Sequence, residues 1–239
     1  IVLSITAITS CISSRSSRIS QCDNALFSAI EQDNYQEVRR LINDGADVYY
    51  IRDDGATCLH IAAVYASEEI VKCLLSELTY WPPFANARNN AGYSALALAA
   101  GAGRQEIVKA MIRAGLSVNG TGKTPLWAAC SENAPTCVIE LLLINKSDPN
   151  AISDGMTCLG AAAYYGRAEV IELLLSRGAD PYVIAGSQRL MAVDHAIRRN
   201  HAGIALRLLQ VMSKDERRDT FFDDMMLNLF AEVTRNTET

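Results

Sequence analysis

The stretch from Gly120 to Ala129, GTGKTPLWAA, contains the residues most suggestive of chemistry. Its Gly122-Lys123-Thr124 matches the end of the phosphate-binding motif G-x-x-x-x-G-K-[ST], in which backbone N–H groups cradle phosphates and the lysine reaches the outer ones. The first glycine of that motif is missing, because Ser117 stands five residues before Gly122. The preceding MIRAGLSV also lacks the buried strand that feeds such a loop. We therefore do not expect a nucleotide site.

The three histidines offer no better case for catalysis. His195 and His201 are six residues apart, a spacing that does not put them on one helical face. Asp194 adjoins His195, but neighbouring residues of a helix point in different directions. No serine, cysteine or threonine has a base recognisably placed beside it, as an activated nucleophile requires. The sequence predicts a non-catalytic protein.

The seven cysteines are odd in number and form no C-x-x-C pair. This pattern argues against a disulfide framework or a zinc module and favours a reducing compartment. Cys130 and Cys137, seven residues apart, could share a helix face, but a metal there would lack further ligands. Cys58 and Cys158 are expected to fill the core as small apolar residues.

Composition excludes several classes of protein. The 239 residues are 49% hydrophobic and carry a net charge of −5, so we expect a folded core and no basic field that would attract nucleic acid. No apolar run reaches the roughly 18 residues that span a bilayer. We expect no cofactor, no nucleic-acid partner and no membrane insertion. The chain starts without Met, which is compatible with a fragment or a processed product.

Residues 1–23 form a Ser-rich leader that we expect to be poorly ordered. A remnant of a signal peptide is the alternative, although no positive region precedes its apolar opening.

A repeated pattern positions the residues considered above. Apolar anchors recur at residues 26, 59, 96, 126, 159 and 193, with spacings of 33, 37, 30, 33 and 34. Most anchors are followed by two apolar pairs that are separated by two residues, as in Ile70-Val71 and Leu74-Leu75. A Gly-Ala-Asp turn closes the first repeat at residues 45–47 and the fifth at residues 178–180. A period of this length indicates stacked structural repeats.

The segments GATCLHIAA, from Gly55 to Ala63, and GMTCLGAAA, from Gly155 to Ala163, carry a family resemblance. They resemble the ankyrin repeat, a unit of a β-turn and two helices with the signature T-P-L-H-x-A. The resemblance implies an all-α solenoid of helix–turn–helix units with β-turn fingers, six of them over residues 24–213, the first and last degenerate. It also implies that His60 hydrogen-bonds between repeats. GKTPLWAA then becomes a loop glycine followed by a helix start, where threonine caps and proline fits the first turn.

Two segments depart from the repeat. An insertion, SELTYWPPFANARNN, occupies residues 76–90, and its paired prolines are expected to stop a helix and stiffen an extended loop. Its Trp81 and Phe84 either fold back over the stack or project as a binding finger. Residues 214–239 are expected to form an amphipathic helix that caps the last repeat; a partner-docking helix is the alternative.

The resemblance also implies which positions contact a partner: the pair after the T-P-L-H-x-A-A block and the residue before its threonine. Tyrosine, tryptophan and arginine, which dominate binding hot spots, are frequent among them. Together with the insertion, the predicted partner-binding residues are Tyr65, Trp81, Tyr93, Lys123, Trp127, Glu132, Met156, Tyr164, Tyr165, Arg198 and Arg199. The alternative is that the tyrosines simply pack against the next repeat.

We therefore expect an adaptor or scaffold that binds another protein or an extended peptide along its concave face, with an acidic group of the partner towards repeat six. One alternative is the substrate-recognition part of a larger enzyme assembly, such as a ubiquitin ligase. An effector of an intracellular microbe and a membrane-tethered protein cut just after its span are further alternatives. The expected location is intracellular and cytoplasmic, with the nucleus also compatible.

Overall fold

The computed structural model describes residues 24–78 and 82–214. These residues fall into two compact units, which we treat separately: an N-terminal unit, ending at Ser117, and a C-terminal unit, which takes Ala100–Gly103 and continues from Val118. Residues 24–31 are helical, and the N-terminal unit continues with α2 (Tyr35–Asn43), α3 (Cys58–Tyr65), α4 (Glu68–Glu77), α5 (Pro82–Ala85), α6 (Ala95–Gly101), whose end belongs to the other unit, and α7 (Gln105–Arg113).

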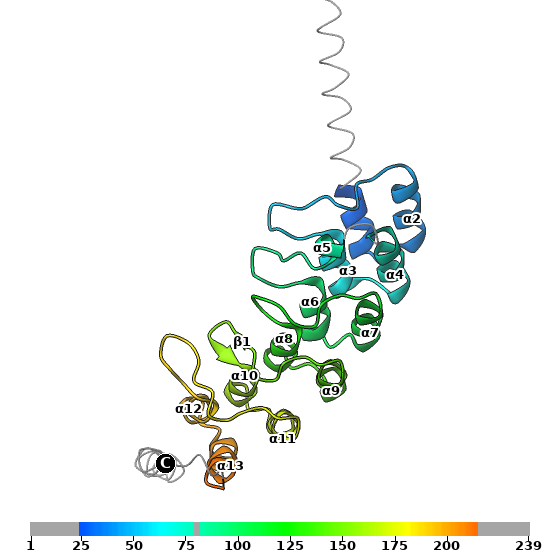
Figure 1. The fold of residues 1–239 in the computed structure, drawn as a ribbon. Coiled ribbons are helices and arrows are strands. Elements are labelled where there is room, and N and C mark those ends of the chain that lie inside the picture. The colour runs from blue at the N-terminus through cyan, green and yellow to red at the C-terminus, as the bar shows by residue number, and fades with distance from the viewer. Residues whose placement is uncertain (1–23, 79–81, 215–239) are drawn as a thin grey trace, which may run out of the picture. The chain divides into compact units, whose positions relative to one another are not determined.

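The C-terminal unit repeats the same alternation of a short first helix and a longer second helix. Its elements are α8 (Pro125–Ser131), α9 (Thr136–Ile144), β1 (Ile152–Ser153), β2 (Met156–Thr157), α10 (Cys158–Tyr164), α11 (Ala168–Ser176), α12 (Ala192–Arg198) and α13 (Ala202–Met212). The first helix α10 packs between α8 and α12, and α9 and α11 form a second layer (Figure 1). The all-α repeat fold expected from the sequence is confirmed.

Threonine starts the first helices as predicted. The Thr124 Oγ1 accepts a hydrogen bond from the Trp127 N–H at 3.3 Å, and Pro125 follows as the first helical residue. The Thr157 Oγ1 caps α10 through the Gly160 N–H at 2.9 Å. Each cap satisfies an N–H group that has no partner inside the helix. The interpretation of GKTPL as a helix start is thereby confirmed.

The Gly-Ala-Asp turns end the second helices. Gly45 has a φ of 91° and Gly178 a φ of 86°, a left-handed conformation that glycine adopts without steric cost. The residue after each glycine donates back to its helix, from Ala46 N to the Leu41 carbonyl at 3.0 Å and from Ala179 N to the Leu174 carbonyl at 2.9 Å. These bonds pair carbonyl groups that the helix end leaves open.

The core forms where the repeats stack. All six predicted anchors are buried: Leu26, Leu59, Leu96, Leu126, Leu159 and Val193. Alanines such as Ala62 and Ala162 are fully buried beside them, and their small side chains permit close helix packing. No repeat covers its own apolar face, so stacking makes one core within each unit.

The insertion does not form the extended loop expected from its prolines. Pro82 and Pro83 instead open the single helical turn α5, because proline lacks the N–H that the first turn would leave unpaired. Phe84 folds back and meets the ring of Tyr49 edge to face at 5.1 Å. For Phe84 the packing alternative therefore holds. Trp81 lies outside the described residues.

The leader, residues 1–23, and the expected capping helix beyond Lys214 also lie outside the described residues, so their boundaries stay predictions. Among the helices that the structure describes, none is both long and apolar enough to cross a membrane.

Candidate protein-binding surface

His60 is a structural residue that joins two repeats. Its Nδ1 lies 2.8 Å from the Thr57 Oγ1, and its Nε2 lies 3.0 Å from the Tyr93 carbonyl oxygen. A carbonyl only accepts, so Nε2 carries a proton, and Nδ1 accepts a hydrogen bond from the Thr57 N–H at 3.2 Å, so the ring is neutral. Burial lowers the pKa of His60, which also favours the neutral ring. The hydrogen bond between repeats implied by the family resemblance is present.

The other two histidines are likewise committed to packing. His195 is buried, burial lowers its pKa, and its ring meets the Tyr164 ring at 6.2 Å. The neighbouring Asp194 points elsewhere and accepts a hydrogen bond from the Met191 N–H at 2.8 Å. His201 donates from Nε2 to the Tyr164 carbonyl at 3.2 Å. In the part of the chain that the structure describes, no three histidine, cysteine or acidic residues come together as metal ligands.

The described cysteines are free thiols and mostly buried. The Cys58 thiol donates to the Val48 carbonyl at 3.1 Å, and burial raises its pKa to about 12. Cys130 and Cys137 do not share a face, because Cys130 is buried and Cys137 is exposed. Cys130 instead meets Cys158, and a hydrogen bond between these thiols, together with burial, raises the pKa of Cys158 well above its usual value. Thiols with raised pKa values are poor nucleophiles.

Lys123 contacts an acidic side chain and an aromatic ring and is not part of a phosphate-binding loop. Its ammonium group lies 3.7 Å from an Asp154 carboxylate oxygen and 5.6 Å from the centre of the Trp127 ring. Trp127 itself is only 5% exposed. The prediction that Trp127 belongs to a binding surface does not fit this burial: at the third position of α8 the ring points into the stack, as His60 does in α3.

Three of the predicted residues are in contact in the C-terminal unit, and a fourth, Arg198, precedes one of them in the chain. Tyr164 and Tyr165 end α10 and meet edge to face at 5.0 Å. The Arg199 guanidinium, which follows α12 in the next repeat, lies 4.5 Å from the centre of the Tyr164 ring. Tyr165 is 52% exposed, and Arg198 and Arg199 are also exposed. We call these four residues the tyrosine–arginine surface.

The remaining predicted residues are scattered. Glu132 is exposed at the end of α8, and Met156 is half-buried on β2. In the N-terminal unit, Tyr65 is 59% exposed at the end of α3, whereas Tyr93 is half-buried. Tyr65 is thus the counterpart of Tyr164 and Tyr165 in a different unit.

Three residues that form hydrogen bonds between neighbouring repeats were not predicted from the sequence. Arg104 precedes α7 and donates to the carbonyls of Ala62 and Ala66 at the end of α3. Arg167 and His201 precede α11 and α13 and reach the ends of α8 and α10 in the same way. The signal was present, because Gly-Arg followed by x-Glu and an apolar pair occurs at both Arg104 and Arg167.

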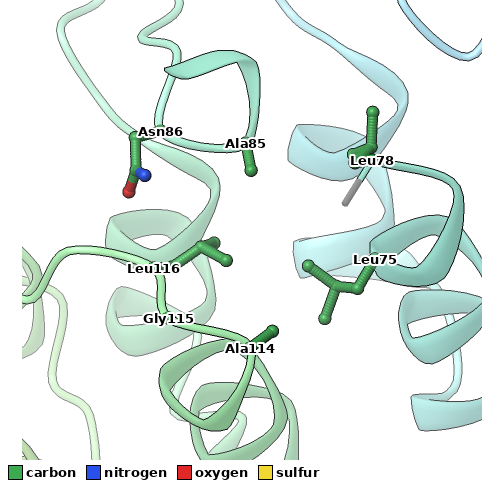
Figure 2. Close-up of a pocket in the computed structure, with 7 residues that line it drawn as sticks. All are labelled: Leu75, Leu78, Ala85, Asn86, Ala114, Gly115 and Leu116. Atoms are coloured by element: carbon green, nitrogen blue, oxygen red, sulfur yellow. The ribbon is translucent and has the colours of Figure 1, made fainter. Parts of the chain in front are cut away.

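Two hollows lie beside these elements, one in each unit. In the N-terminal unit, Figure 2 shows leucines at the end of α4 facing α5 and the turn after α7 across a cavity of about 170 Å³. It is lined by Leu75, Leu78, Ala85, Asn86, Ala114, Gly115 and Leu116. Its one polar side chain, Asn86, accepts a hydrogen bond from the Ser117 N–H at 2.8 Å. This cavity is an apolar gap between repeats.

The hollow of the C-terminal unit is an open groove of about 330 Å³ beside Tyr165. It is lined by Asn133, Thr136, Tyr165, Gly166, Arg167, Ala168, Glu169 and Val170. The groove therefore adjoins the tyrosine–arginine surface and presents both polar and apolar side chains.

Several known proteins resemble this chain. The mouse B-cell lymphoma 3 protein homolog is 28% identical over 166 residues, which make up 66% of this chain and 37% of that protein. Human NF-kappa-B inhibitor alpha is 28% identical over 142 residues, or 54% of this chain and 44% of that protein. The chain thus spans less than half the length of these two relatives.

Among solved structures, one chain of a predatory endopeptidase from Bdellovibrio bacteriovorus in complex with an immunity protein is similar. The TM-score is 0.61 with 28% identity, covering 78% of this chain and 97% of that one. Models of ankyrin repeats match residues 26–75 (many copies) and residues 77–153 and 116–185 (three copies). With the repeat register and helix pairs described above, the chain belongs to the ankyrin-repeat family.

Proposed function

We propose that this chain is a non-catalytic interaction module, an adaptor or scaffold, that binds a protein or an extended peptide. The observation that carries the proposal is the tyrosine–arginine surface of the C-terminal unit. Tyrosine and arginine combine a large contact area with polar groups, and they dominate the energetics of protein interfaces.

The surface is organised before a partner arrives. Tyr164 is half-buried and contacts Tyr165, His195 and Arg199, so its ring is held on several sides. A side chain that is already ordered loses little conformational entropy on binding. Tyr165 stays half exposed beside this fixed ring. Such a residue is available to pack against a partner, and its removal should leave the fold intact.

The relatives support the same class of function. One similar chain comes from a complex of an endopeptidase with an immunity protein, and another relative is named as an inhibitor of NF-kappa-B. In the described residues, the histidines and most cysteines are committed to packing, which fits a binding role better than catalysis. We place the protein in a reducing, intracellular compartment, since the described cysteines are free thiols.

The test is an affinity capture with matched variants. Tyr165→Ala/Arg199→Glu alters the surface. The control Ile144→Ala/Arg177→Glu also replaces one large side chain by alanine and one arginine by glutamate, at exposed residues at the end of α9 and directly after α11. We expect a protein that the wild type and the Ile144/Arg177 variant both retain, and that the Tyr165/Arg199 variant loses while keeping its melting temperature. Equal capture by all three proteins would refute the proposed surface.

A further inference from the structure

We infer that the tyrosine–arginine surface selects a partner segment with acidic side chains. The inference rests on the proposed function and adds the chemistry of the partner. Its starting observation is that Arg198 and Arg199 are exposed cations that no carboxylate neutralises within the described residues.

The contacts of these two arginines are with neutral groups. Arg198 Nη1 donates to the Gln188 side-chain oxygen in the finger before α12. Arg199 lies over the Tyr164 ring. These contacts orient both guanidinium groups and leave their positive charge uncompensated.

Several other arginines of the described residues are paired or committed to carbonyl groups. Arg207 makes a two-pronged ion pair with Glu172, at 2.6 and 2.8 Å, and Arg52 pairs with Glu31 at 3.3 Å. Arg104 and Arg167 are committed to carbonyl groups at helix ends. Two adjacent arginines without an ion pair, at residues 198 and 199, therefore do not follow from a shortage of acidic residues in a chain of net charge −5.

The geometry suits a carboxylate. A guanidinium group over an aromatic ring uses its face for that contact, whereas its N–H groups lie in the plane and point outward. The outward N–H groups of Arg199 can donate paired hydrogen bonds to a carboxylate, and Arg198, the preceding residue, supplies a second exposed cation. Because contacts within the protein already orient the arginine side chains, these lose less conformational entropy when a partner binds.

The surroundings favour a protein segment over nucleic acid. Nucleic-acid binding relies on many lysines and arginines that neutralise successive phosphates. Here Arg199 contacts Tyr164, Tyr164 contacts Tyr165, and Tyr165 lines the groove. An acidic residue at the arginines can be followed by an apolar or aromatic residue against Tyr165. The segment that fits is thus acidic with an adjacent large side chain.

The inference is tested by selecting displayed random short peptides on the full chain. Three proteins are compared: the wild type, Arg198→Glu/Arg199→Glu, and the control Arg177→Glu, which reverses an exposed charge after α11. We expect aspartate and glutamate to be enriched among peptides selected by the wild type and the control, and lysine and arginine to replace them on the double variant. Circular dichroism melts establish that all three proteins are folded.

A synthetic peptide from the wild-type pool then gives the magnitude. We expect the double reversal to weaken its binding about tenfold or more, with a weaker effect at high salt. Selected peptides without acidic enrichment, or with the same enrichment on the double variant, would overturn the inference. Peptides that need Tyr165 but are not acidic would leave the proposed function standing, whereas peptides indifferent to Tyr165→Ala would refute that function as well.

Discussion

Replacing Arg167 by methionine should destabilise the C-terminal unit. Arg167 Nη1 donates to the carbonyls of Ala129, at 2.6 Å, and Cys130, at 3.3 Å, and Nη2 donates to the Ala134 carbonyl. These acceptors lie at and after the end of α8, where carbonyl groups lack partners within the helix. Methionine keeps an apolar stem and removes the donors together with the positive charge, as the control Arg177→Met also does.

The expected loss is about 2–4 kcal/mol. A hydrogen bond from a charged donor contributes roughly 1.5–3 kcal/mol, and a buried acceptor left without a partner adds to the cost. The acceptors lie at the end of α8 and in the loop after it, where water can replace part of the lost hydrogen bonding, so we expect less than the sum of three such bonds. With a urea slope of about 2 kcal/mol per molar, the unfolding midpoint should fall by roughly 1–2 M.

The assay is urea unfolding followed by circular dichroism and by tryptophan fluorescence, to which Trp127, buried in α8, contributes together with Trp81. Hydrogen exchange should show the loss concentrated in α8 and the loop after it, because repeats depend mainly on their nearest neighbours. Arg177→Met is the matched control: it removes an exposed arginine and should change stability by less than about 0.5 kcal/mol. Equal midpoints for the two variants would refute the reasoning.

Three further predictions concern the glycine, histidine and cysteine positions. Gly178→Ala should lower the free energy of unfolding by about 1 kcal/mol from its positive φ alone. Gly186→Ala should lower it distinctly more, because the added methyl would lie 2.6 Å from the Gly155 carbonyl oxygen. Urea unfolding compares the two variants, and equal losses would contradict the described packing. Burial lowers the pKa of His60, so the unfolded chain binds the proton more readily than the folded protein does. The free energy of unfolding should therefore be highest above about pH 6.5 and fall as the pH falls. Unfolding of His60→Gln measured over the same pH range should show a smaller decrease. In the folded protein, iodoacetamide should modify the exposed Cys137 and spare the buried Cys58, and peptide mass spectrometry that found the reverse order would argue against the described packing.

The repeat architecture was predictable because it depends on periodic apolar residues and on local caps. Leu59, Leu126 and Leu159 lie at the same position of their repeats, two repeats and one repeat apart, and each is buried. Threonine caps and left-handed glycines act within a few residues of themselves, so their signals are readable from the chain. The paired prolines were misread because proline both ends one helix and starts another.

The candidate surface was only partly predictable. Tyr165 and Arg199 occupy positions that the family pattern marks as partner contacts. Trp127 was also predicted on the surface, but it stands where the family has its structural histidine and is buried. Arg104 and Arg167 were missed because their partners are backbone carbonyls 33 to 42 residues away. Every residue has such a carbonyl, so the Gly-Arg-x-Glu pattern shared by Arg104 and Arg167 marks the two arginines but does not identify their partners.

The central claim is that a partner protein contacts the tyrosine–arginine surface, and site-specific photo-crosslinking tests it most directly. A photoreactive phenylalanine derivative would replace Tyr165 in one protein and Ile144, which is 67% exposed at the end of α9, in another. We expect one partner to be crosslinked through position 165, position 144 to give no such product, and Arg199→Glu to abolish the product. A partner crosslinked equally through both positions, or through position 144 alone, would show that the tyrosine–arginine surface is not the binding site.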